Sequence, residues 1–362
     1  MAMRKPDFDR LLSVLFREEP DVIPFYEHAV DPEVIETLTG KPVTRMSFGS
    51  DEFLKALVEF YYKLGYDYVP LEIPLNLPIT NVRTAHDTAI LSRGQRTWQD
   101  EGRGTIENRE DFENYPWPSP EEAADLSGLE RLARLLPDGM EIVGGVAGGV
   151  FEYVSWIMGL APLSRAIYMD RRLVEDMFER IGRLISKVDE EIAKMDRIGA
   201  LRMGDDLGYK KGTFIRPQLI RRYVLPWHKR CVETAHRRGL PFILHSCGNL
   251  YRVDETGRSL MDDLVDYVGI DAKHSFEDEI KPVWEVKAKY GERVAILGGV
   301  DMDKLARSPT DRLRRYVGEV VRRCAPGGGY ALGSGNTIAN YVKLENYLAM
   351  LEEGEKYGRY PR

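Results

Sequence analysis

The chain has 362 residues, of which 43% are hydrophobic and 30% are charged, and its formal net charge is -7. Acidic and basic residues are interspersed, so no basic stripe is present to bind a phosphate backbone, and we expect no nucleic-acid partner. No apolar run approaches the roughly 18 residues that span a bilayer, and the start of the chain is unlike a signal peptide, so we expect a cytoplasmic protein without a membrane partner.

Eight apolar runs of strand length follow one another along the chain. Between most of them lie segments with apolar residues at three- and four-residue spacing, which predicts helices over 162–195 and 216–239. Gly239 suits the end of the second helix. The predicted strands cover 22–28, 66–73, 141–147, 199–206, 241–247, 266–272, 293–300 and 329–336.

Strands that alternate with helices form right-handed parallel units, and eight such units close into a (β/α)8 barrel. We therefore predict an α/β fold with a single TIM-barrel domain over 1–362. The alternative is an open doubly wound sheet, but the sequence has no nucleotide-binding glycine fingerprint. Residues 80–118 interrupt the alternation after the second strand. We interpret them as an insertion, with a β-hairpin around Arg93-Gly94, over one mouth of the barrel.

Polar residues end seven of the eight predicted strands. Barrel enzymes carry their chemistry at the carboxyl ends of the strands, where the βα loops converge. A shared rim is therefore predicted for Glu27-His28, Glu72, Asp205-Asp206, His245-Ser246-Cys247, the stretch from Asp271 to His274, Asp301, and Ser334-Gly335-Asn336.

His245 and Cys247 are two residues apart, which places both on one side of an extended chain. Imidazole and thiolate together are ligands that zinc prefers. With only three cysteines in the chain no disulfide framework is expected, so Cys247 would act as a thiol or thiolate. The alternative is that His245 bonds a loop carbonyl and Cys247 is a small buried apolar residue.

Two further groups extend this site. His274 either completes a metal site with His245 and Cys247 or is a hydrogen-bonding loop histidine. Asp205 and Asp206 hold a substrate, act as general base or bind the metal, unless they cap a helix or pair with an arginine such as Arg202. His228 and Cys231, three apart on an outer helix, are expected to be structural.

Glycines and polar residues after the last two strands predict substrate contacts. Gly298-Gly299 and Gly333-Ser334-Gly335 let backbone amides approach a ligand closely, although they equally permit tight turns. The substrate-binding candidates in these loops are Gly299, Asp301, Ser334 and Asn336.

These motifs carry a resemblance. "REEPDVIPFYEH", "DDLGYKKGTFIRPQLIRRYVLPWHK", "HSCGN" and "GYALGSGNTIANYVKLENYLAML" are similar to segments of the uroporphyrinogen decarboxylase superfamily, which includes cobalamin-dependent methyltransferases. The resemblance implies a (β/α)8 barrel. In the methyltransferase branch it implies zinc held by the His-x-Cys pair and by a later cysteine, whose position here looks like Ser334. A hydroxyl is a poor zinc ligand, so His274 or an aspartate would complete the site.

The decarboxylase branch fits less well, because the arginine cluster that would grip several carboxylates is missing. We therefore expect a corrinoid-dependent methyltransferase, with zinc and with a corrinoid such as methylcobalamin as co-substrate or on a partner corrinoid protein. It would act on a small-molecule methyl donor or acceptor. The alternatives are a cofactor-free decarboxylase that uses Glu72 or Asp206, and a non-catalytic corrinoid-binding barrel.

Overall fold

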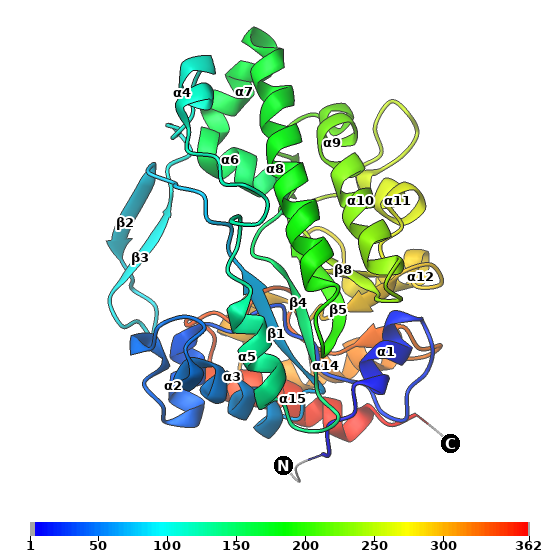
Figure 1. The fold of residues 1–362 in the computed structure, drawn as a ribbon. Helices are drawn as coiled ribbons and strands as arrows, with labels where there is room; N and C mark the ends of the chain where they lie inside the picture. Colours follow the sequence, from blue (N-terminus) through cyan, green and yellow to red (C-terminus); the bar gives the residue numbers. More distant parts are fainter. Residues whose placement is uncertain (1–3, 361–362) are drawn as a thin grey trace.

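A computed structural model describes residues 4–360 of the chain. Seven parallel strands form one curled sheet, and helices pack around its outside (Figure 1). This is the α/β architecture of a TIM-barrel-like fold. In spatial order the strands are β1 (Tyr68–Ile73), β4 (Glu141–Val146), β5 (Ile198–Gly204), β8 (Phe242–His245), β9 (Ala272–His274), β10 (Ala295–Leu297) and β11 (Tyr330–Ala331).

The first predicted strand, 22–28, is not a regular strand. The segment meets the chain after β11 through isolated parallel bridges, Phe25 to Leu332 and Val30 to Ile338. Pro24 lies next to the first bridge and has no backbone N–H to donate, so a continuous ladder cannot form there. The segment still runs beside the sheet and brings Glu27 and His28 to its carboxyl end.

The predicted strand over 266–272 is also displaced. Residues Leu264–Val268 form a short π-helical turn, η2, that ends at Gly269 with φ of 79°. The strand itself, β9, begins only at Ala272. The last two strands are shorter than predicted, because the chain turns into loops soon after the strands enter the sheet.

The helices fall between the strands as expected. Their bounds are α1 (Asp9–Leu15), α2 (Pro32–Thr39), the 3₁₀ turn η1 (Val43–Arg45), α3 (Asp51–Lys63), α4 (Arg109–Asn114), α5 (Ser127–Leu135), α6 (Val150–Met158), α7 (Leu160–Met169), α8 (Arg171–Ile192), α9 (Pro217–Tyr223), α10 (Leu225–His236), α11 (Leu260–Asp263), α12 (Val283–Tyr290), α13 (Met302–Arg307), α14 (Thr310–Cys324) and α15 (Leu344–Tyr357).

Both long predicted helices are divided in two. The segment 162–195 breaks at Asp170, whose carboxylate accepts the N–H of Leu173 over 2.9 Å and so caps α8. The segment 216–239 breaks at Val224, because Pro226 lacks the N–H that would continue α9 and sits in the first turn of α10. The spacing of apolar residues continues through both breaks and therefore does not predict them.

The inserted hairpin is present. Strands β2 (Val82–His86) and β3 (Gln95–Gln99) pair antiparallel and are joined by the loop 87–94. Figure 1 shows this ribbon standing away from the curled sheet. A second, two-residue hairpin, β6 (Gly208–Tyr209) with β7 (Gly212–Thr213), follows β5. No helix within 4–360 is both long enough and apolar enough to span a bilayer.

Candidate functional site

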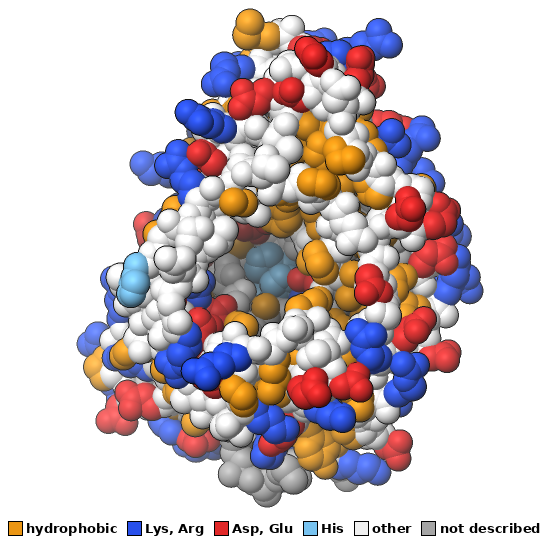
Figure 2. All heavy atoms as spheres, turned by 60° about the vertical axis from the view of Figure 1, so that its left-hand side comes forward, with side chains coloured by type: hydrophobic (Ala, Val, Ile, Leu, Met, Phe, Trp, Pro, Cys, Tyr) orange, Lys and Arg blue, Asp and Glu red, His pale blue; other side chains and the backbone are white. Residues whose placement is uncertain are grey.

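The polar strand ends meet at the carboxyl edge of the sheet. A space-filling view shows a deep hollow in the surface with histidine side chains at its bottom (Figure 2). His28, His245 and His274 each offer a nitrogen, and these nitrogens lie within 4.8 Å of one another. They come from the 22–30 segment, the end of β8 and the end of β9. The sequence predicted that His28 lies at a strand end, but it indicated no role for this residue.

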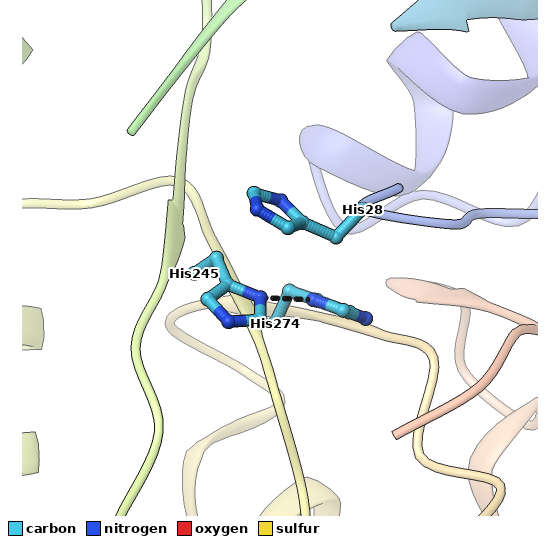
Figure 3. A group of neighbouring side chains, drawn as sticks. All are labelled: His28, His245 and His274. Carbon is cyan, nitrogen blue, oxygen red and sulfur yellow. Dashed lines mark hydrogen bonds between the residues drawn. The ribbon is translucent and has the colours of Figure 1, made fainter. Parts of the chain in front are cut away.

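The three imidazoles form a group, called the histidine stack here, in which His28 lies over His245 and one hydrogen bond joins His245 to His274 (Figure 3). The rings of His28 and His245 are parallel to within 22°, with centroids 4.0 Å apart. Nδ1 of His245 lies 2.7 Å from Nδ1 of His274. At this distance one nitrogen donates a hydrogen bond to the other. His274 therefore contacts Nδ1 of the His245 ring, whereas Cys247 lies near Nε2.

Burial fixes the protonation of this pair. It lowers the pKa of His245 well below its ordinary value and that of His274 to about 3, so both rings are neutral near pH 7. The Ser334 carbonyl oxygen, 3.2 Å from Nε2 of His274, can only accept a hydrogen bond. His274 therefore carries its proton on Nε2, His245 donates from Nδ1, and Nε2 of His245 keeps a lone pair.

That lone pair faces Cys247. Sγ of Cys247 lies 3.5 Å from Nε2 of His245, as the two-residue spacing predicts. Asn336 Nδ2, at 3.1 Å, and the Ser275 hydroxyl, at 3.3 Å, both donate toward the sulfur. Burial raises the pKa of the Cys247 thiol, so without a metal the sulfur is protonated.

Asp206 completes a set of three ligand atoms. Its carboxylate accepts the N–H of Cys247 over 2.7 Å and lies 3.6 Å from Nε2 of His245. Zinc–nitrogen and zinc–sulfur distances of about 2.0 and 2.3 Å at a tetrahedral angle separate those two ligand atoms by about 3.5 Å. The nitrogen, sulfur and carboxylate atoms all lie within 4.8 Å of one another, so their chemistry and spacing fit zinc.

Asp205 points away from this set. Its carboxylate accepts the N–H groups of Phe151 and Glu152, at 3.1 and 2.9 Å, and so caps α6. His228 on α10 lies 2.6 Å from the same carboxylate, and both side chains are fully buried. The capping interpretation therefore describes Asp205, although the helix that it caps lies far upstream. Asp205 is not paired with Arg202, and His228, which we expected to be structural, is bonded to Asp205 inside the protein.

Glu72 forms a second buried ion pair. Arg202, which is 3% exposed, lies 2.9 Å from Glu72 and also donates to the carbonyl oxygen of His28. Burial raises the pKa of Glu72, while the guanidinium opposes that rise. The carboxylate is 3.9 Å from Nε2 of His28. Glu72 thus lies beside His28 and links it to a buried ion pair.

Ser334 and Asn336 have separate surroundings. Ser334 is fully buried, and its hydroxyl contacts the carboxylate of Glu27, which also accepts the N–H of Ser334 over 2.9 Å. Burial raises the pKa of Glu27 to about 8. No described contact joins the Ser334 hydroxyl to Cys247. Asn336, by contrast, donates to the thiol and also lines a cavity of about 630 Å³.

The two remaining substrate-binding candidates, Asp301 and Gly299, make contacts that stabilise the fold. Asp301 lines the same cavity as Asn336, but its carboxylate caps α13 by accepting the N–H of Lys304 over 3.2 Å. Gly299 has φ of 102°, and a Cβ there would lie 2.4 Å from Val283 of α12. The glycine therefore permits a tight turn and close packing.

Lys273 is a buried residue whose role the sequence did not reveal. Its ammonium group donates to the carbonyl oxygens of Ser246 and Ser275, at 2.8 and 3.0 Å, and so ties the loops after β8 and β9 together. Burial lowers the pKa of Lys273 to about 8. Both Lys273 and His28 lie at predicted strand ends, so the sequence placed them near the site. It could not identify the residues that they contact, because these come from distant segments.

Comparison with solved structures shows a similar fold. The solved structure of a methyltransferase from Methanosarcina mazei superposes with a TM-score of 0.72 and 17% identity, covering 96% of this chain and 98% of the other. A glycoside hydrolase family 10 xylanase from Gloeophyllum trabeum is less similar, with a TM-score of 0.40 and 12% identity over 64% of this chain and 80% of the other. Comparison with curated protein sequences found no match.

The family itself follows from the sequence. The model of the family described as uroporphyrinogen decarboxylase (URO-D) matches residues 102–357, which include every strand of the curled sheet from β4 onward and the His245–Cys247 pair. The same residues build most of the site, and the fold of the whole chain agrees. The chain therefore belongs to the uroporphyrinogen decarboxylase family.

Proposed function

We propose that this protein is a zinc-assisted methyltransferase of corrinoid-dependent one-carbon metabolism. The observation that carries the proposal is the ligand set at the carboxyl edge of the sheet: a neutral imidazole with its lone pair on Nε2, a thiol 3.5 Å away and a carboxylate 3.6 Å away. The fold similarity to a methyltransferase supports it. His245, Cys247 and Asp206 would hold the metal.

The chain's own residues prepare this set for a metal. His274 holds the His245 ring in the correct tautomer, and ligands oriented in this way bind metal more tightly. Asn336 and Ser275 donate to the sulfur and favour its thiolate form. Three protein ligands leave a fourth position for a substrate. When bound, zinc supplies a Lewis acid that lowers the pKa of a substrate thiol or polarises a methyl donor.

The other candidates divide into two groups. Asp206, Asn336 and Asp301 are proposed to face substrate, because the first lies at the ligand set and the other two line a cavity. Asp205, Glu72, Ser334 and Gly299 are proposed to position the site through the contacts described above, and His274 does so for the metal.

The setting of the reaction is also part of the proposal. A small molecule would exchange a methyl group with a corrinoid, either free methylcobalamin or the cofactor of a partner corrinoid protein. The 362 residues would act as a single domain, with the 22–30 segment as the eighth member of a (β/α)8 barrel, in the cytoplasm and without nucleic-acid or membrane partners.

Decarboxylation is the second candidate, because the matching family bears that description. Arg202, which donates to the carbonyl oxygen of His28, is already paired with Glu72. This guanidinium is therefore not free to pair with a substrate carboxylate. Incubation with uroporphyrinogen, scored for loss of carboxylates, tests this candidate directly.

Metal analysis tests the leading proposal. Protein purified without added zinc should carry about one equivalent of zinc, as a three-ligand site implies. The His245→Ala, Cys247→Ala double variant should carry almost none, with an unchanged circular dichroism spectrum, and a His86→Ala control on the exposed hairpin should match the parent protein. Equal, near-zero metal in all three removes the Lewis-acid role. Demethylation of methylcobalamin by a thiol, followed by visible absorption, then tests the reaction.

A further inference from the structure

A small cavity beside Asp206 has an aromatic wall. Its volume is about 220 Å³, and it lies between β3, α6 and the segment before α9. This is below the roughly 300–1,000 Å³ of pockets for drug-sized ligands. Four aromatic side chains line it: Trp98, Phe151, Trp156 and Phe214. The rings of Phe151 and Phe214 are nearly parallel, with 11° between their planes and 6.0 Å between centroids.

The polar part of the wall is acidic. Asp100, Glu101, Glu152 and Asp206 line the cavity, and no lysine or arginine does so within the described residues. Asp100 is already paired with Arg83, over 2.8 Å. Within 4–360, neither Glu152 nor Asp206 has a lysine or arginine within salt-bridge distance. Besides Asp100, the carboxyl groups of Glu101, Glu152 and Asp206 therefore line the cavity without a lysine or arginine of the described chain within salt-bridge distance.

Burial makes this imbalance costly. It raises the pKa of Glu152 well above its ordinary value, and the nearby carboxyls of Asp205 and Asp206 add to that rise. If Asp206 and Cys247 bind zinc as proposed, their two negative charges are neutralised there. Glu101 and Glu152 then remain as the carboxyl groups whose charge a cationic ligand would balance.

The mixture of aromatic faces and carboxylates selects one ligand class. Hard metal cations require oxygen ligands on several sides, whereas here much of the wall is aromatic. Aromatic faces attract organic cations, and quaternary ammonium groups are recognised in this way. An anionic ligand would meet unbalanced carboxylates.

We infer that this cavity binds the cationic head group of a small organic ammonium compound, which is the methyl donor or acceptor of the reaction. Asp206 lines the cavity and also lies 3.6 Å from Nε2 of His245, so a ligand held there is adjacent to the ligand set. The role as donor or acceptor rests on the proposed function. The binding of the cation does not.

Isothermal titration calorimetry of the full chain, stripped of metal, tests the inference. Choline and 3,3-dimethylbutan-1-ol have the same shape and differ in charge. Choline should bind at least about tenfold more tightly than the neutral alcohol, since a desolvated cation–π contact and a carboxylate both act on the charge. Cysteamine, an ammonium compound with a thiol, distinguishes the two possible roles of the ligand. Tighter binding of choline indicates an N-methylated donor, and tighter binding of cysteamine indicates a thiol acceptor.

Variants locate the site. Trp98→Leu on the exposed hairpin and Glu152→Gln, which keeps a group able to accept the N–H of Gly149, should each weaken the preferred cation by about threefold or more. Trp117→Leu, outside the cavity, should leave binding unchanged. Equal binding of choline and the neutral alcohol, no binding of either cation, or unchanged binding in both cavity variants overturns the inference.

The outcome is separable from that of the proposed function. The titration contains neither metal nor corrinoid, so no methyl transfer can occur in it, and a protein that binds the cation but lacks zinc keeps the cavity assignment and loses the methyltransferase proposal. A protein that contains zinc and demethylates methylcobalamin, but binds choline no more tightly than the neutral alcohol, keeps the methyltransferase proposal and loses the cavity assignment.

Discussion

Replacing the buried carboxyl of Glu27 with an amide should stabilise the metal-free protein, and by more as the pH rises. Glu27 is fully buried, and within 4–360 its carboxyl accepts hydrogen bonds only from the N–H and the hydroxyl of Ser334, neither of which carries a charge. Burial raises its pKa from 4.5 to about 8 in the folded chain. In the unfolded chain the pKa returns to its ordinary value, so the folded state holds more protons between these two pH values.

The sign and the size follow from this difference. The stability that the protonated Glu27 provides is complete below pH 4.5 and is lost as the pH rises through about 8. Each pH unit of the shift corresponds to about 1.4 kcal/mol, so the full effect is on the order of 5 kcal/mol. Glu27→Gln cannot ionise and escapes this loss. Its advantage over the parent protein should be small at pH 5 and several kcal/mol at pH 8.

Urea denaturation of both proteins at pH 5, 6, 7 and 8 measures the advantage. Other groups titrate in this range, but both proteins contain them, so they cancel in the difference. Glu122→Gln is the control, because hydrogen bonds from Ser119 lower the pKa of Glu122, and it is ionised throughout this window. A difference between Glu27→Gln and the parent that stays constant from pH 5 to pH 8 would refute the reasoning.

Three further predictions concern the surroundings of the ligand set. His274→Phe should lower zinc affinity by about 10–100-fold in a chelator competition, because His245 loses the partner that sets its tautomer; unchanged affinity would count against the hydrogen-bond chain. Arg202→Met should cost about 3 kcal/mol in urea denaturation by leaving Glu72 unpaired, and adding Glu72→Leu should restore most of it. Gly299→Ala should lower stability by about 1–3 kcal/mol, since its Cβ would meet Val283 at 2.4 Å; a neutral effect would show that the turn can relax.

Local sequence patterns predicted the parts of the site that lie within one segment. The spacing of His245 and Cys247 placed both on one side of a strand end, and the structure brings sulfur and nitrogen to 3.5 Å. A hairpin around Arg93-Gly94 was predicted from turn residues, and the structure has one whose longer loop covers 87–94. Both features depend on residues that are near one another in the chain, so their geometry follows from local backbone rules.

Contacts between distant segments were beyond such patterns. Asp205 resembled a catalytic residue because no helix follows it, yet it caps α6, which precedes it by more than fifty positions. His28 joins the stack only because the 22–30 segment lies beside the chain after β11. The strand predicted over 22–28 was wrong for a related reason: apolar composition indicates burial, but Pro24 prevents regular pairing.

The adjacent residues Asp205 and Asp206 also affect how mutational data on this protein should be read. Asp205 anchors the first turn of α6, the helix that contributes Phe151, Glu152 and Trp156 to the small cavity. An Asp205 variant that no longer turned over substrate would invite the conclusion that this carboxylate performs chemistry. We expect the loss to arise instead because α6, and with it one wall of the small cavity, is displaced. A crystal structure of the variant would show this displacement, which rate measurements alone could not distinguish from the loss of a reacting group.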